Sequence, residues 1–269
     1  MMPMGGLETL NKHYFYNVRV FMIETKQVSL MDVLSFQFSD LFEKYYNEIV
    51  ARSGFIIEFH LHENLPEFND EAAYSRFNEG VIHVYLSSSL TEGQAEVLAA
   101  HEITEPVLNR VEMYPNLYVT HLGYLQKDWY GGLGIKIGSA VLNAVANKRL
   151  KEYGFDIEKL KEATLLRLLR RLPLLSAIIN SEEEITVNAL IYLDHYLSYS
   201  PSVEIDKLTE YFMNNGGEQW KLIQSLVSIS EETGFENIDQ TLACMVMIRD
   251  HLNLKPYLLV RDRRNDSLQ

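Results

Sequence analysis

The chain has 269 residues, 47% of them hydrophobic, so it is long enough to fill one large core or two smaller ones. Its 24 lysines and arginines against 37 aspartates and glutamates give a formal net charge of -13, which argues against nucleic acid or an anionic membrane as a partner bound through overall charge. The sequence shows no signal-peptide pattern at its start and no apolar run of the roughly 20 residues needed to span a bilayer, so we expect a cytoplasmic protein.

The first third of the chain mixes strand and helix signals. Residues 15–23 (FYNVRVFMI) are strand-like, and residues 30–50 carry apolar side chains at helical spacing. Two short strands are predicted at residues 55–61 (FIIEFHL) and 81–86 (VIHVYL), separated by a polar stretch. A helix then begins after Thr91, since Thr91 and Gln94 form a capping-box pattern.

The remainder is predicted to be almost entirely helical. We expect a glycine-rich and aromatic loop at residues 114–134, with the run GGLGIKIG forming a tight loop over the preceding helix, and then a helix at residues 139–153 that ends at Gly154. Five further helices are predicted at residues 156–172, 181–197, 205–213, 220–234 and 238–252. The fold class is therefore α+β and predominantly α-helical. We place an α+β domain at residues 1–154 and a helical domain at residues 155–269, either as separate units or around one shared core.

One short motif carries a chemical signal. In HEITE, His101 and Glu105 stand four residues apart on the predicted helix and project on the same side, while Glu102 points beside them. The surrounding residues are apolar nearly all round, which predicts a buried helix. Because an unpaired buried charge costs several kcal/mol, these groups need partners, either a metal ion or polar side chains from elsewhere in the chain.

This motif and the order of the elements around it resemble zincin-type metallopeptidases, including the cytoplasmic IrrE/ImmA-like peptidase domains. The resemblance covers roughly residues 55–153, with VIHVYL similar to the edge strand on the substrate side and NAVANKRL (residues 143–150) similar to the E-x-x-A-N pattern. It implies a zinc ion held by His101, Glu105 and Asn143, with Glu102 as the general base that hydrolyses a peptide or amide bond. The chain departs from the family in having Glu105 and Asn143 at two ligand positions.

Pro106 adds a physical objection to this site. It disfavours helical geometry at Glu105 and removes a helical hydrogen-bond donor, so we expect a kink where two ligands should align. His121, in the predicted loop after the motif, is the most plausible replacement ligand.

Two other interpretations stay open. His101 and Glu102 could be satisfied within a polar network in the core, without an ion. The protein could also be a non-enzymatic interaction or regulatory protein that binds a protein or peptide partner through aromatic side chains of its helical half, namely Tyr192, Tyr196, Tyr199, Tyr211, Phe212 and Trp220.

The remaining histidines and glycines carry weaker signals. His60 and His62 alternate on a predicted strand and His83 lies on the next one, which an exposed strand face explains without a ligand. His195 and His251 each follow an aspartate directly and so do not form acid–histidine dyads on a helix. The glycine run lacks the spacing of a dinucleotide-binding fingerprint.

Overall fold

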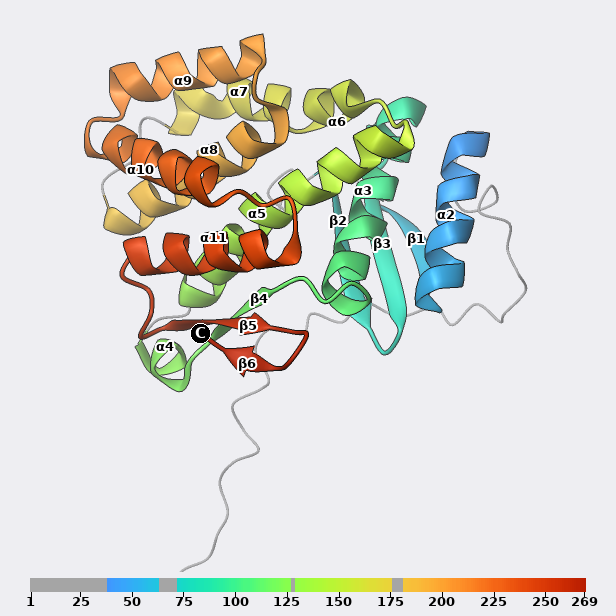
Figure 1. The fold of residues 1–269 in the computed structure, drawn as a ribbon. Coiled ribbons are helices and arrows are strands. Elements are labelled where there is room, and N and C mark those ends of the chain that lie inside the picture. The colour runs from blue at the N-terminus through green and yellow to red at the C-terminus, as the bar shows by residue number, and fades with distance from the viewer. Residues whose placement is uncertain (1–37, 63–71, 127–128, 176–180) are drawn as a thin grey trace, which may run out of the picture.

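The protein is an α+β structure built mainly of helices, as the sequence predicted (Figure 1). The structure is a computed structural model and describes residues 38–62, 72–126, 129–175 and 181–269. The strand predicted at residues 15–23 lies outside these ranges, as does the first part of the helix predicted from residue 30.

A three-stranded sheet forms one end of the molecule. It consists of β1 (Ile56–His62), β2 (Ala73–Asn78) and β3 (Val81–Ser87) in the order β1-β3-β2, with β1 parallel and β2 antiparallel to β3. The expectation that VIHVYL is the edge strand is therefore wrong, because this segment is the central strand. Its antiparallel edge neighbour β2, which we did not predict, is created by a tight turn at Glu79 and Gly80, both with positive φ.

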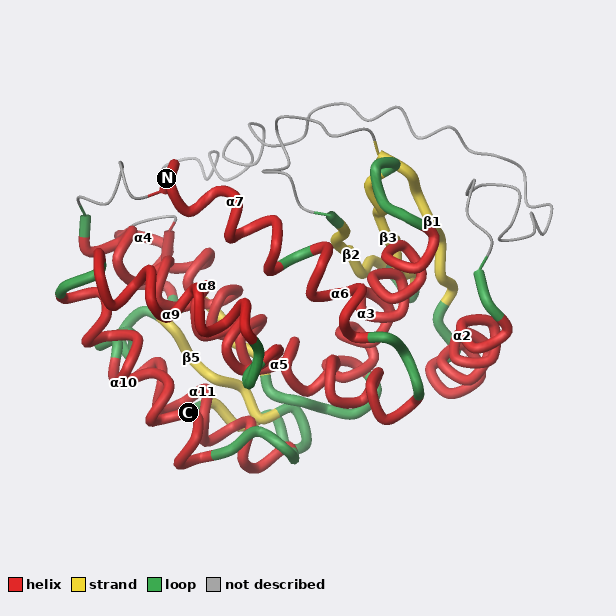
Figure 2. Tube along the Cα trace, turned by 90° about the horizontal axis from the view of Figure 1, so that it is seen from above, coloured by secondary structure: helices red, strands yellow, loops and turns green. Residues whose placement is uncertain are grey.

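Two helices cover one face of this sheet (Figure 2). They are α2 (Asp40–Ser53) and α3 (Glu92–Arg110). Alternate residues of β3, Ile82, Val84 and Leu86, are buried beneath them, as the period of a strand requires.

The motif helix α3 begins at the predicted capping box, in which Thr91 accepts from the Gln94 amide and the Gln94 side chain accepts from the Thr91 amide. The helix continues through Pro106 for a further turn and ends at Arg110.

The predicted glycine-rich loop is instead ordered secondary structure. It contains β4 (Asn116–Val119), α4 (His121–Gln126) and the start of the long helix α5 (Trp129–Tyr153). The loop prediction was wrong because the glycines serve packing: a Cβ at Gly134 would stand 3.2 Å from Leu258 Cδ2 and 3.6 Å from Leu117 Cβ. The predicted end of the helix is confirmed, since Gly154 follows it with φ of 112°.

The rest of the chain is a helical layer followed by a hairpin. The helices are α6 (Ile157–Ala163), α7 (Leu165–Leu175), α8 (Glu182–Tyr199), α9 (Val203–Asn215), α10 (Glu218–Thr233) and α11 (Ile238–His251). The helix predicted at residues 156–172 is thus divided into two at Thr164, and the second part extends past Pro173. The unpredicted strands β5 (Leu258–Asp262) and β6 (Ser267–Leu268) join β4 in a second antiparallel sheet.

Two apolar clusters fill the interior, and α5 contributes to both. One cluster lies between α2, α3 and the first sheet, and it includes Leu150 of α5. The other lies among the remaining helices and the second sheet, and it includes Ile137 and Val141 of α5. None of the described helices combines the length and the apolar character that crossing a bilayer requires.

Candidate functional site

His101 lies in the middle of α3 and is 8% exposed. The helix packs against the first sheet on one side and against α5 on another, and its many alanines (Ala95, Ala99 and Ala100 are fully buried) allow the backbones to approach closely. The imidazole is thereby placed where α3 faces α5.

Two asparagines of α5 hold the imidazole ring. Asn143 and Asn147 are one turn apart on the same side of α5. His101 Nδ1 lies 2.9 Å from Asn147 Oδ1, and His101 Nε2 lies 3.2 Å from Asn143 Oδ1. Both ring nitrogens therefore face amide oxygens, although a neutral imidazole has only one N–H to donate.

Asp194 of α8 completes the network from a third helix. The Asn143 Nδ2 group donates to both Asp194 oxygens, at 3.1 and 3.3 Å. Burial raises the pKa of Asp194 to about 6, although the Asn143 hydrogen bond and the nearby His101 act in the opposite direction. The carboxyl is therefore poised to change its charge near neutral pH.

These side chains open onto a pocket of about 620 Å³. His101, Glu102, Asn143 and Asp194 all line it, together with Ala73 at the start of β2. The remaining polar lining residues are Lys136, Asn147, Thr164, Arg167, His195, Ser198 and Tyr199. A cavity of this size, with several converging polar groups, is typical of a small-molecule or peptide site.

The pocket also perturbs the titration of its other groups. Burial, and to a lesser extent Lys136, lower the pKa of His195 to about 4, so this imidazole is neutral at physiological pH. Burial raises the pKa of Tyr199, whose hydroxyl lies 2.9 Å from Thr164 Oγ1. Shifted pKa values that cluster in one cavity are a feature of functional sites.

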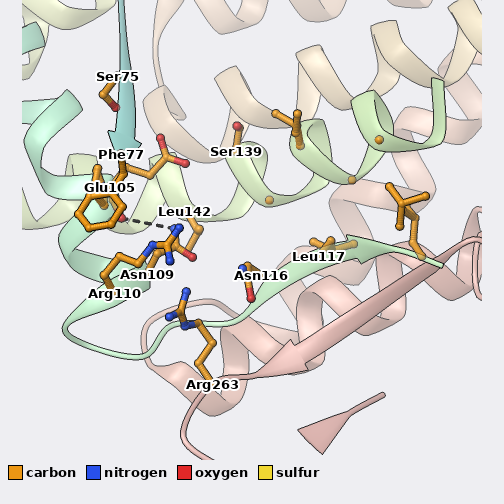
Figure 3. Close-up of a pocket in the computed structure, with 17 residues that line it drawn as sticks. Ser75, Phe77, Glu105, Asn109, Arg110, Asn116, Leu117, Ser139, Leu142 and Arg263 are labelled. Carbon is orange, nitrogen blue, oxygen red and sulfur yellow. Dashed lines mark hydrogen bonds between the residues drawn. The ribbon is translucent and has the colours of Figure 1, made fainter. Parts of the chain in front are cut away.

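Glu105 is directed to a different pocket, shown in Figure 3. This cavity of about 310 Å³ lies further along the α3–α5 contact, and the Glu105 carboxyl points into it from α3 toward α5. Burial, followed by the charge of Glu102, raises the pKa of Glu105, while His101 lowers it. The structure thus brings His101, Glu102 and Asn143 to one cavity and Glu105 to another.

Of the other residues considered from the sequence, His195 and Tyr199 also line the 620 Å³ pocket, whereas the following residues do not. His121 is exposed at the start of α4 and is not among the described residues that line the 620 Å³ pocket. Of the aromatic residues considered as a binding surface, Tyr192 and Phe212 are buried and meet edge to face in the core, with ring centroids 5.6 Å apart.

Sequence reasoning missed Asp194. Asp194 is adjacent to His195, and neighbouring residues on a helix do not face each other, so no site was expected at this position. A usable signal was present, because this carboxylate directly follows the apolar segment ALIYL in a helix whose buried residues include Ala189, Leu190 and Leu193.

Comparison with known proteins adds no family: no family model matches the chain, and no curated protein or solved structure shows significant similarity to it.

Proposed function

We propose that the 620 Å³ pocket is the site of a metal-assisted hydrolysis of a peptide or amide bond, with a divalent ion such as zinc held between α3, α5 and α8. The observation that carries this proposal is the approach of His101 Nε2 to Asn143 Oδ1 at 3.2 Å, on the wall of a pocket that Glu102 also lines.

The hydrogen bonding of His101 favours a cation at this point. The shorter contact, from Nδ1 to Asn147 Oδ1, is a normal hydrogen bond when Nδ1 carries the proton. Nε2 then presents a lone pair toward the Asn143 oxygen, so two acceptors face each other, and a cation between them would relieve that repulsion. Two ligands about 2.1 Å from a tetrahedral zinc ion are separated by about 3.4 Å, close to the spacing found here.

Asp194 is the best third donor, in place of Glu105 and His121. Its carboxylate accepts a hydrogen bond from Asn143 and lines the same pocket. A set of one imidazole nitrogen, one amide oxygen and one carboxylate oxygen suits a borderline divalent ion, and Asn147 fixes the imidazole tautomer as outer partners of metal ligands do. When bound, the ion would polarise the scissile carbonyl group and acidify a water molecule.

The side chains of the pocket supply the remaining roles. Glu102 follows His101 directly and lines the same pocket, so we assign it as the general base that takes a proton from the attacking water. The positive charges of Lys136 and Arg167 on the pocket wall favour a substrate that carries a carboxylate, such as a peptide.

A second candidate function is non-catalytic binding of a peptide in the same pocket. Two observations favour it. Both ring nitrogens of His101 already contact side-chain amides, and Glu105 lines a different pocket from His101. In this alternative, Asn143 and Asn147 form part of a polar network around His101 and no ion is held.

Metal analysis separates the two candidates. Protein purified without an affinity tag and dialysed against zinc should lose one bound equivalent in the His101→Ala and Asp194→Asn variants, whereas His121→Ala, the exposed-histidine control, should retain it. Cleavage of a library of fluorogenic peptides should fall by about 10²–10⁴-fold in Glu102→Gln without loss of bound metal.

Each outcome has a defined reading. The same zinc content in wild type, His101→Ala and Asp194→Asn would overturn the metal site and leave the non-catalytic alternative. If His101→Ala lost one bound equivalent of zinc but wild type cleaved none of the peptides, the metal site would stand and the proposed hydrolytic activity would be wrong.

A further inference from the structure

The outward face of the first sheet brings two imidazoles and a carboxylate together. Glu58 and His60 are two residues apart on β1 and therefore point to the same face. In the parallel pairing of β1 with β3, Glu58 stands opposite His83. The alternate residues Ile57, Phe59, Ile82 and Val84 are buried, so this trio lies on the face opposite to the one that α2 and α3 cover.

The three potential ligand atoms have the separations that one ion requires. His83 Nδ1 lies 3.1 Å from Glu58 Oε2 and 3.3 Å from His60 Nε2, and His60 Nε2 lies 3.9 Å from Glu58 Oε2. Ligands about 2.0–2.2 Å from a zinc ion are separated by about 3–4 Å for coordination angles between about 90° and 140°. Among the described residues, Glu58, His60 and His83 form a group of three potential metal ligands whose ligand atoms all lie within 4.8 Å of one another.

The site is ordered by its neighbours before any ion binds. The His60 ring stacks on Tyr85 with centroids 4.7 Å apart, and Tyr85 stacks on Tyr74 of β2 at 4.6 Å. This row of rings restricts the rotamer of His60, which lowers the entropic cost of holding a ligand in place.

We propose that Glu58, His60 and His83 form a surface site for a divalent transition-metal ion of the zinc class, separate from the pocket around His101. Two imidazoles and one carboxylate are a donor set typical of zinc and of non-haem iron. The side chains of Glu58, His60 and His83 are 50%, 38% and 27% exposed, so the remaining coordination positions are open to water or to a ligand from a partner.

One neighbouring charge opposes the ion. Arg76 of β2 stands opposite His83, but its guanidinium lies over the Tyr74 ring, 5.5 Å from the centroid. That position leaves the carboxylate of Glu58 as the charged group in direct contact with His83.

Zinc titration of the full chain by isothermal calorimetry tests the site. Wild type should bind one equivalent that is lost in His83→Ala and weakened at least about tenfold in Glu58→Gln, because loss of a direct ligand should cost no less than loss of an outer one. The control His121→Ala removes an exposed histidine outside the site and should bind as wild type does. His101→Ala should keep this equivalent, which separates the outcome from that of the proposed hydrolytic pocket.

Histidine-selective NMR gives a second measurement on folded wild-type protein. The ring resonances of His60 and His83 should shift when zinc is added to saturation, whereas that of His121 should not. Equal stoichiometry and affinity in wild type and His83→Ala, or unshifted resonances of His60 and His83, would overturn the site.

Discussion

At the scale of single residues, Asp194 is the most informative side chain. Its proposed role as a metal ligand requires a charged carboxylate, whereas its buried surroundings favour the protonated form. The carboxyl lines a pocket to which α3, α5, α6, α7 and α8 all contribute residues, and its hydrogen-bond partner is the neutral amide of Asn143. A charged carboxylate without a fully charged direct partner is unfavourable in such a place, which is why its pKa rises from 3.8 to about 6.

This shift predicts that Asp194→Asn stabilises the metal-free protein at neutral pH. The folded state holds the Asp194 proton up to about pH 6, whereas the unfolded chain releases it near 3.8, so wild type loses stability as pH rises through this window. The amide of the variant carries no charge and can still accept from Asn143. We expect the free energies of unfolding to agree below about pH 4, and the variant to be more stable by about 1–3 kcal/mol above pH 6.5, after allowing for solvent access through the pocket.

Urea unfolding in the presence of a chelator, followed from pH 4 to 8, measures this difference. Adding excess zinc should narrow it, because an ion that binds only the folded wild type adds stability in proportion to the logarithm of its concentration. If Asp194→Asn were less stable than wild type at pH 7.5 in chelator, burial of the charged Asp194 carboxylate would not destabilise the fold, and the prediction would be wrong.

At the scale of secondary-structure elements, the sequence predicted helices well where capping signals and apolar spacing agree, as at Thr91 and Ser181. It failed at the start of α5, because glycine signals a loop locally but here permits close contact with strands from distant parts of the chain. The strands β4 and β5 also depend on contacts between distant parts of the chain. Each is short and becomes a strand through its pairing with the other, so neither was predicted. The site divides in the same way: the motif on α3 is visible as a local pattern, whereas Asp194 requires knowledge of how α8 packs.

The glycines of this region predict opposite effects of the same substitution. A Cβ at Gly132 of α5 would meet nothing within 4 Å, so Gly132→Ala should stabilise the protein by about 0.5–1 kcal/mol through helix propensity alone. At Gly123 of α4, a Cβ would stand 2.7 Å from the Tyr257 backbone oxygen, so Gly123→Ala should destabilise the fold by about 1–3 kcal/mol. Thermal unfolding of both variants measures the pair, and a stabilising Gly123→Ala would contradict the packing of α4 against the strand that follows Tyr257.

At the scale of the whole molecule, α5 connects the two apolar clusters. Leu150 near its end packs with the first sheet and α3, while Ile137 and Val141 pack with the helical layer. Tyr199 at the end of α8 contacts both clusters. Because one rigid helix carries part of each core, we expect loss of either cluster to remove support from the other.

This connection predicts a single cooperative unfolding transition that the two tryptophans can report. Trp129 and Trp220 both pack against the cluster of the helical layer, whereas Ile82 is fully buried in the other cluster, beneath α3. Ile82→Ala should cost about 2–5 kcal/mol, and the midpoint from tryptophan fluorescence should fall together with the midpoint from far-ultraviolet circular dichroism. Leu226→Ala, in the cluster that the tryptophans contact, serves as the matched control and should shift both signals as well. If Ile82→Ala instead produced an early circular dichroism transition while the tryptophan midpoint stayed at its wild-type value, the two clusters would unfold independently of each other.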